Sequence, residues 1–192
     1  MDETVYRFLK YTAIALVVAW VGWSLYDSFM RDTEPGDRAF HSAERLFEDR
    51  AYQRALEQYQ RALQESPDHI HALRGYARTM MMLGENDEAL RAFNDAIELE
   101  PDFGGTFANR GILYDRMGDY KLAIQDYEHS LELDQDIAKG PHWLTRFLRL
   151  QPEKPPGIAE RAAYLRAELA KPEGERLLRV PELDEQQRSY KQ

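Results

Sequence analysis

Residues 108–134 read ANRGILYDRMGDYKLAIQDYEHSLELD, and this stretch decides the fold because its spacing recurs twice earlier in the chain. The recurring positions share a step of 34 residues and form three sets: Ala55, Ala89 and Ala123; Tyr59, Phe93 and Tyr127; Ala43, Ala77 and Gly111. Apolar and small residues at this helical spacing predict a pair of helices in each copy. One such pair cannot bury its own apolar face, so we expect the copies to stack.

Turn residues separate the expected helices. Gly84 and Gly118 are predicted to end the first helix of a copy in the left-handed conformation, and Arg50 takes that place in the first copy. Pro67 and Pro101 are predicted to stop the second helix, because proline cannot continue it. The positions of these turn residues therefore agree with the 34-residue spacing of the helix pairs.

The pattern resembles the tetratricopeptide repeat family. The resemblance spans residues 36–137 and implies three repeats, at 36–69, 70–103 and 104–137. The first copy departs most, because Ala39 and Ser42 stand where large apolar residues are usual, and the third copy has Gln135 in place of its final proline. The resemblance implies an all-α solenoid, and a generic antiparallel helical bundle is the alternative.

Two further apolar stripes follow the repeats. The first contains Trp143, Leu144, Phe147 and Leu148, and the second contains Ile158, Ala162, Leu165 and Leu169. At helical spacing they predict a pair of capping helices within 138–170. Residues 171–192 hold two prolines and many charges, which indicates an extended tail. This tail either wraps back on the repeats or contacts another subunit.

The N-terminal part is expected to cross a membrane. Residues 11–26 read YTAIALVVAWVGWSLY and carry no charge, and aromatic residues lie at both ends of the run. We predict a single transmembrane helix with residues 8–29 in the bilayer, flanked within residues 1–35. A cleaved signal peptide and a buried soluble helix are the alternatives.

The flanks of this run suggest its orientation. Arg7, Lys10 and the α-amino group precede the run, whereas residues 27–38 hold two arginines and four acidic residues. The Lys and Arg counts of the two flanks are close to even, and the α-amino group tips the balance. The positive-inside rule then places the N-terminus in the cytoplasm and the bulk of the chain across the membrane. In a bacterium this is an inner-membrane protein with a periplasmic domain. Four small residues share one helix face and could form a packing seam for another membrane helix: Thr12, Ala15, Ala19 and Gly22.

Composition excludes several classes of function. The chain has 192 residues, with 25 Lys and Arg against 34 Asp and Glu, giving a formal net charge of −9. A surface of this sign repels phosphate backbones, so we expect no nucleic-acid partner. The chain has no cysteine, which excludes disulfides, thiolate metal sites and thiol nucleophiles. The mean hydropathy of the whole chain is −0.66 although residues 11–26 are strongly apolar, so the rest of the chain is strongly polar.

The sequence lacks the residue arrangements that are typical of catalytic sites. It contains no phosphate-cradling glycine loop, no nucleophile elbow and no obvious pair of catalytic carboxylates. His69 and His71 are the one suggestion of a metal site, and a solvated turn is the simpler interpretation. We therefore expect no enzyme activity, no cofactor and no metal.

The resemblance implies a different kind of site. In this family the first helix of each repeat lines a concave groove that holds a peptide or a partner helix. Carried over to this chain, the groove comprises Phe40, Glu44, Phe47, Arg74, Arg78, Met81, Met82, Asn109, Ile112, Asp115, Arg116 and Lys139. Arg74, Asn109 and Lys139 resemble part of a clamp for a terminal carboxylate, but Phe40 and Glu44 replace its first two members.

These observations lead to one expected function and two alternatives. We expect a membrane-anchored interaction protein that scaffolds, or helps to assemble, an envelope or inner-membrane complex. The first alternative is an accessory subunit of a large membrane enzyme complex, held by its transmembrane helix and its tail. The second is a mitochondrial import receptor, which the acidic residues after the span disfavour.

Overall fold

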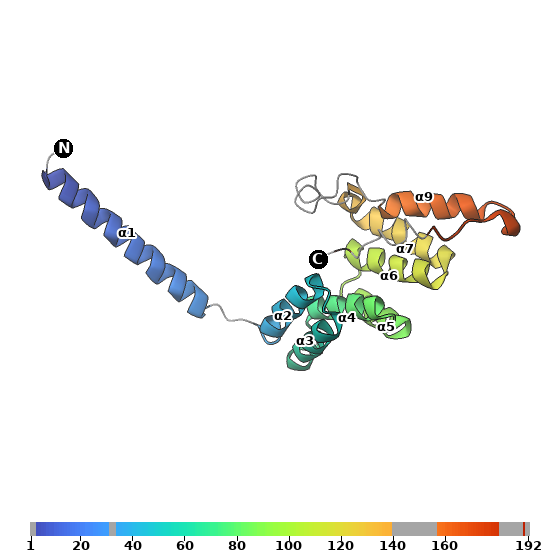
Figure 1. Cartoon of the computed structure of the whole chain (residues 1–192), viewed down its shortest axis with the longest axis horizontal. Coiled ribbons are helices and arrows are strands. Elements are labelled where there is room, and N and C mark those ends of the chain that lie inside the picture. The colour runs from blue at the N-terminus through green and yellow to red at the C-terminus, as the bar shows by residue number, and fades with distance from the viewer. Residues whose placement is uncertain (1–2, 31–33, 140–156, 181–189, 191–192) are drawn as a thin grey trace. The chain divides into compact units, whose positions relative to one another are not determined.

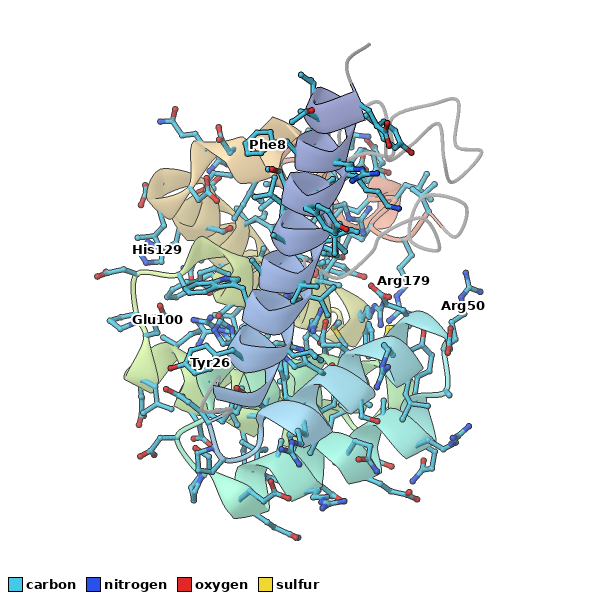
Figure 2. The ribbon with its side chains drawn as sticks, turned by 90° about the vertical axis from the view of Figure 1, so that its left-hand side faces the viewer. Phe8, Tyr26, Arg50, Glu100, His129 and Arg179 are labelled. Atoms are coloured by element: carbon cyan, nitrogen blue, oxygen red, sulfur yellow. The ribbon has the colours of Figure 1, made fainter. Side chains whose placement is uncertain are left out.

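The computed structural model describes residues 3–30, 34–139, 157–180 and 190, and these divide into two units, Met1–Glu34 and Pro35–Gln192. The first unit consists of one long helix, α1 (Glu3–Met30). Its large apolar side chains from Val5 to Tyr26 are exposed, and the rings of Phe8 and Tyr26 project from the ribbon (Figure 2). Among the described residues it is the one helix long and apolar enough to cross a membrane.

The second unit is a series of helical pairs (Figure 1). The pairs are α2 (Asp37–Glu48) with α3 (Tyr52–Glu65), α4 (Ile70–Leu83) with α5 (Asn86–Leu99), and α6 (Gly104–Met117) with α7 (Tyr120–Leu133). Helices α3, α5 and α7 each have 14 residues and begin 34 residues apart, at Tyr52, Asn86 and Tyr120. The described residues contain no strand, so the predicted all-α solenoid is confirmed.

The repeat positions occupy equivalent places in successive pairs. Ala55, Ala89 and Ala123 are each the fourth residue of the second helix, and all three are fully buried. The aromatic positions four residues later are fully buried as well. A Cβ atom at Gly111 would come within 2.7 Å of the Tyr127 ring, so the small residue on the first helix sets how closely the second helix packs.

The turn residues behave as their chemistry predicts. Gly84 and Gly118 end α4 and α6 with φ of 85° and 90°. Arg50 takes the same left-handed conformation, with φ of 59°, after the shorter helix α2. After Pro67 and Pro101 the chain turns into the next repeat, whereas the third repeat continues into the short 3-10 helix η1 (Gln135–Lys139).

The end of the solenoid is covered by α9 (Ile158–Leu169), which packs against α7. This helix coincides with the second predicted apolar stripe, while the first stripe lies outside the described residues. Beyond it, η2 (Glu173–Glu175) leads into an extended run as far as Val180. Leu178 and Tyr190 both pack against the core that α4, α5, α6, α7 and α9 share.

Candidate protein-interaction face

The first helices of the repeats form one side of the stack, because α2 contacts α4 and α4 contacts α6. We call the surface formed by α2, α4 and α6 the inner face. It carries all but one of the predicted groove residues, and the exception is Lys139, in η1. The side chain of Lys139 lies outside the described part of the structure.

Glu44, on α2, is the centre of the first polar cluster on this face. Its carboxylate accepts a hydrogen bond from the Tyr59 hydroxyl of α3 and one from Arg78 Nη2 of α4, the latter at 2.6 Å. Burial raises the pKa of Tyr59, and the hydrogen bond to Glu44 adds to this, so the hydroxyl remains protonated. We call Glu44, Tyr59 and Arg78 the Glu44 cluster. It joins the first repeat to the second.

Asp115, on α6, is the centre of a second cluster of the same kind. It accepts from the Tyr127 hydroxyl of α7 at 3.2 Å, and from Nε and Nη2 of Arg161 on α9 at 2.7 and 2.8 Å. The two arginine bonds are parallel, which is the strongest arginine–carboxylate geometry. We call Asp115, Tyr127 and Arg161 the Asp115 cluster. It joins the third repeat to the capping helix.

Arg74 lies one helical turn before Arg78 on α4. Its guanidinium is ion-paired with Glu100 and lies over the Phe103 ring, 3.9 Å from the ring centre. The Arg78 guanidinium lies over Phe47 in the same manner, at 5.0 Å. Burial lowers the pKa of Arg74, although the carboxylate of Glu100 opposes this.

Both arginines retain buried donors that have no acceptor. Arg74 and Arg78 are 3% and 1% exposed, yet in the described part of the chain Nε of Arg74 and both Nε and Nη1 of Arg78 have no hydrogen-bond partner. Leaving buried N–H groups unsatisfied costs free energy, and a ligand with carboxylate or carbonyl oxygens would remove that cost. Three guanidinium nitrogens of α4 are therefore buried without an acceptor among the described residues.

The remaining predicted groove residues divide by exposure. Met81 and Ile112 are buried in the core and support the stack. Phe40 and Phe47 are half-buried and pack against aromatic neighbours, His69 and Tyr52 respectively. Met82 is half-buried and Arg116 is exposed, and Arg116 Nη1 lies 3.7 Å from the Met82 sulfur.

Asn109 contacts the C-terminal segment of the chain. Its Nδ2 donates to the Tyr190 carbonyl at 3.0 Å, and its Oδ1 accepts from the Tyr190 amide at 2.7 Å. The Asn109 amide is thus engaged by Tyr190 through both its nitrogen and its oxygen, and Nη2 of Arg74 is engaged by Glu100. Glu44 is committed to its own cluster. Two of the residues that resemble a carboxylate clamp therefore hold groups of the chain itself.

His69 is a structural residue, so the expectation of a solvated turn is wrong for this side chain, whereas His71 is exposed as expected. Its side chain is largely buried, because the ring caps α4: Nδ1 accepts from the Ala72 amide at 3.2 Å, and Nε2 lies 3.2 Å from Asp37 Oδ1. With Nδ1 as the acceptor, Nε2 carries the proton and donates to Asp37. Among the described residues no group of three or more His, Asp or Glu side chains could hold a metal ion.

Three residues that organise the face were not predicted as site residues: Arg161, Tyr190 and His69. Their partners are distant in sequence, and Arg161 lies 46 residues beyond Asp115. One signal was available, because the repeat position reads Tyr59, Phe93 and Tyr127. A buried tyrosine needs a hydrogen-bond partner and a phenylalanine does not, so the pattern indicates polar partners in the first and third repeats alone.

Comparison with known proteins agrees with this architecture. Two tetratricopeptide repeat models match the chain, at residues 46–104 and 106–137. Among curated proteins, Protein SGT1 homolog of Oryza sativa is 31% identical over 118 residues, which is 62% of this chain and 30% of that protein. Hsp70-Hsp90 organizing protein 3 of Arabidopsis thaliana is 27% identical over 89 residues, 46% of this chain and 16% of that protein. The chain thus spans a minor part of the length of these relatives.

Solved structures share the fold. The first repeat domain of Spaghetti (RPAP3), bound to the HSP90 peptide SRMEEVD, has a TM-score of 0.52 at 20% identity and covers 69% of this chain and 96% of that chain. YrrB, described as having an unusual peptide-binding site, has a TM-score of 0.51 at 22% identity and covers 62% of this chain and 59% of that chain.

These findings define the class of protein. The chain contains an α-solenoid made of tetratricopeptide repeats, as the sequence predicted. The family is a scaffold for interactions and is generally non-catalytic.

Proposed function

We propose that this chain is a membrane-anchored tetratricopeptide repeat protein that binds a protein partner on its inner face, and so scaffolds or helps to assemble an envelope or inner-membrane complex. One observation supports the interaction: on α4, the central helix of that face, Arg74 and Arg78 hold buried N–H groups that find no acceptor among the residues the structure describes. Carboxylate and carbonyl oxygens of an extended protein segment are acceptors of the right kind. The names of the relatives, which include Hsp70-Hsp90 organizing proteins, support a protein partner.

The anchor is argued from α1. Its apolar side chains gain no burial from the described part of the chain, and each would gain about 1.5–3 kcal/mol on leaving water. The Thr12 hydroxyl donates to the Phe8 carbonyl at 2.9 Å, so this polar group is satisfied within the helix, as a lipid environment requires. These features favour a bilayer around residues 8–29.

The inner face is tested by replacing both arginines with lysine. Arg74→Lys and Arg78→Lys keep a cation for Glu100 and Glu44 but remove the unpartnered N–H groups. A photo-crosslinking residue placed at Met82 should capture the partner in intact cells, and the double lysine variant should reduce that capture at least five-fold. Arg91→Lys, on the exposed side of α5, is the matched control. The same crosslinks in all three proteins would contradict an inner-face site.

The anchor and its orientation are tested separately. Alkaline carbonate should leave the chain in the membrane fraction, and sequencing of the mature N-terminus should find α1 uncleaved. A reporter fused after Gln192 that is active only outside the cytoplasm should report activity. Release by carbonate would remove the anchor from the proposal, and a cytoplasmic reporter would reverse the orientation.

In the alternative function, an accessory subunit of a membrane enzyme complex, the packing seam of α1 would contact another membrane helix. Thr12, Ala15, Ala19 and Gly22 are exposed, and a Cβ atom at Gly22 would meet no atom within 4 Å. Ala15→Leu with Ala19→Leu would fill the seam without lowering hydrophobicity. If the seam holds the protein in a complex, this variant should leave the complex while the Arg74 and Arg78 variants stay.

A further inference from the structure

Leu177 and Leu178 contact the capping helix α9 through their peptide groups. Glu168 Oε2 accepts from the Leu177 amide at 2.8 Å, and the Leu177 carbonyl accepts from the Tyr164 hydroxyl at 2.6 Å. Arg161 Nη2 donates to the Leu178 carbonyl at 3.1 Å. Side chains of α9 therefore hold an extended stretch of chain by its peptide groups.

Contacts to α6 continue this arrangement. Arg179 Nη2 donates to the Arg116 carbonyl at the end of α6, at 3.2 Å (Figure 2 labels Arg179). Seven residues earlier on the same helix, Asn109 makes its two hydrogen bonds to the amide and carbonyl of Tyr190. One asparagine side chain thus satisfies both peptide groups of one residue, as a neighbouring β-strand would.

The Tyr190 side chain lies between the core and the first turn of α9. Its ring is half-buried against the core shared by α6 and α9, and its hydroxyl oxygen accepts from the Ile158 amide at 3.4 Å. That amide belongs to the first turn of α9 and has no partner within the helix. Burial raises the pKa of Tyr190, which keeps the hydroxyl neutral.

We propose that Asn109 and the Ile158 amide form a recognition site for a tyrosine in an extended segment, and that this chain's own Tyr190 occupies the site until a partner segment displaces it. The proposal rests on the proposed function in one respect, the protein partner. Asn109 is 4% exposed with Tyr190 in place, so a partner can reach its amide only if Tyr190 leaves. Tethering gives Tyr190 a high effective concentration, so a free segment competes at a disadvantage.

Displacement is feasible because the contacts holding Tyr190 are few. Among the described residues these contacts are two hydrogen bonds between the Asn109 side chain and the Tyr190 backbone, one longer bond from the Ile158 amide, and the packing of one half-buried ring. The peptide groups recover hydrogen bonds to water when they leave, so each bond contributes little net free energy. Asn109 binds only the backbone of Tyr190, so selectivity for tyrosine over other residues comes from the contacts of its ring and hydroxyl.

A peptide-binding experiment tests the proposal. The probe is a fluorescein-labelled peptide with the sequence of residues 186–192, QQRSYKQ, and the proteins are the full chain and a chain ending at Ser189, both in detergent micelles. The shortened chain should bind the peptide at least ten-fold more tightly than the full chain. Replacing tyrosine by alanine in the peptide should abolish binding, and replacing it by phenylalanine should weaken binding a few-fold.

Variants of the site sharpen the result. Asn109→Ser in the shortened chain should weaken binding at least ten-fold, whereas Asn94→Ser, an exposed asparagine on α5, should leave it unchanged. Equal affinity of the peptide for the full and shortened chains would overturn the proposal. No binding to a shortened chain that melts like the full one would do the same.

A second measurement needs no added peptide. The chain has no cysteine, so Gln192→Cys accepts a single spin label. The label should be immobilised in the full chain and become mobile in Asn109→Ser. Immobilisation that depends on protein concentration would assign the site to a second copy and overturn the intramolecular contact. These tests use no partner, so they can fail while crosslinking at Met82 succeeds, and the reverse.

Discussion

The Glu44 cluster and the Asp115 cluster use the same chemistry in different surroundings. Each joins a carboxylate of a first helix, a tyrosine of the second helix and an arginine of the helix that follows. The Glu44 side chain is 24% exposed, whereas that of Asp115 is 4% exposed and held by two parallel bonds. A carboxylate open to water loses less when its partner is removed, so the two clusters should differ in their effect on stability.

The second repeat shows what the clusters are for. It carries Phe93 where the other repeats carry tyrosine, and Met81 stands 34 residues before Asp115. That repeat is packed on both sides by other repeats, and the buried Phe93 adds apolar contacts to the shared core without needing a hydrogen-bond partner. The first and third repeats stand at the ends of the stack, where polar clusters join them to their neighbours. In the third, the neighbour is α9, which is not itself a recognised repeat.

The largest expected effect is that of Arg161→Ala. It removes both arginine hydrogen bonds from the buried Asp115 carboxylate, which keeps the Tyr127 hydroxyl as a donor, and breaking a buried ion pair in this way costs about 3–5 kcal/mol. Chemical denaturation of the full chain in detergent micelles measures the free energy of unfolding. Because α9 depends on this pair, the loss should appear first at the C-terminal end, as faster amide exchange in α9.

Arg161 also binds the Leu178 carbonyl, so the pair must be isolated from the tail. A double-mutant cycle with Asp115→Ala does this, since the tail bond is lost whenever Arg161 is replaced. The coupling energy should exceed that of the Glu44 and Arg78 cycle. Equal coupling energies would remove the distinction between the two clusters.

Arg78→Ala should have a smaller effect. The Glu44 carboxylate that remains is partly hydrated and still accepts from Tyr59, and the unpartnered N–H groups of Arg78 are removed together with the ion pair. We expect a loss of about 1–2 kcal/mol in the same denaturation experiment. A loss as large as that of Arg161→Ala would show that exposure of the carboxylate does not control the cost.

Much of this arrangement follows from the repeat period, and part of it does not. The helix pairs and their buried alanines depend on contacts between neighbouring turns of one repeat, so a step of 34 residues predicts them. The first helix of the first repeat forms despite Ala39 and Ser42, because Ala39 packs in a separate small core with Tyr59. Local departures from the family pattern were therefore tolerated by tertiary packing.

The inner face was harder to predict. The sequence places Arg78, Glu44 and Asp115 on it, but exposure and pairing depend on which side chains meet across repeats. Arg161 and Tyr190 come from segments without a repeat period, so no spacing links them to Asp115 or Asn109. The resemblance implies a groove that holds a partner segment, whereas Asn109 and Arg74 on the inner face contact the chain's own Tyr190 and Glu100.

Tyr59 of the Glu44 cluster should make the free energy of unfolding depend on pH in the alkaline range. The pKa of Tyr59 is raised in the folded state, mainly by burial, so above about pH 10 the unfolded chain releases a proton that the folded chain keeps. Stability is then constant below that pH and falls as the pH rises, by about 1.4 kcal/mol per unit for this group. Tyr59→Phe should reduce the slope by that amount. The ring is retained, as in Phe93, and an unchanged slope would contradict the assignment.

The smallest effect expected also compares the first repeat with the others. Arg50 holds the left-handed conformation that Gly84 and Gly118 hold in later repeats, and this conformation costs a residue with a side chain about 1–2 kcal/mol. Figure 2 shows Arg50 pointing away from the repeats, so its side chain contributes little there. Arg50→Gly should raise the free energy of unfolding by about 0.5–1 kcal/mol, after the entropy that glycine loses on folding. Gly84→Ala is the matched control, because its Cβ would meet nothing within 4 Å and its cost reports backbone strain alone. Destabilisation by Gly84→Ala without any effect of Arg50→Gly would show that the strain at Arg50 is offset by the short helix α2. The first repeat would then differ from the others in its helix length as well as in its turn.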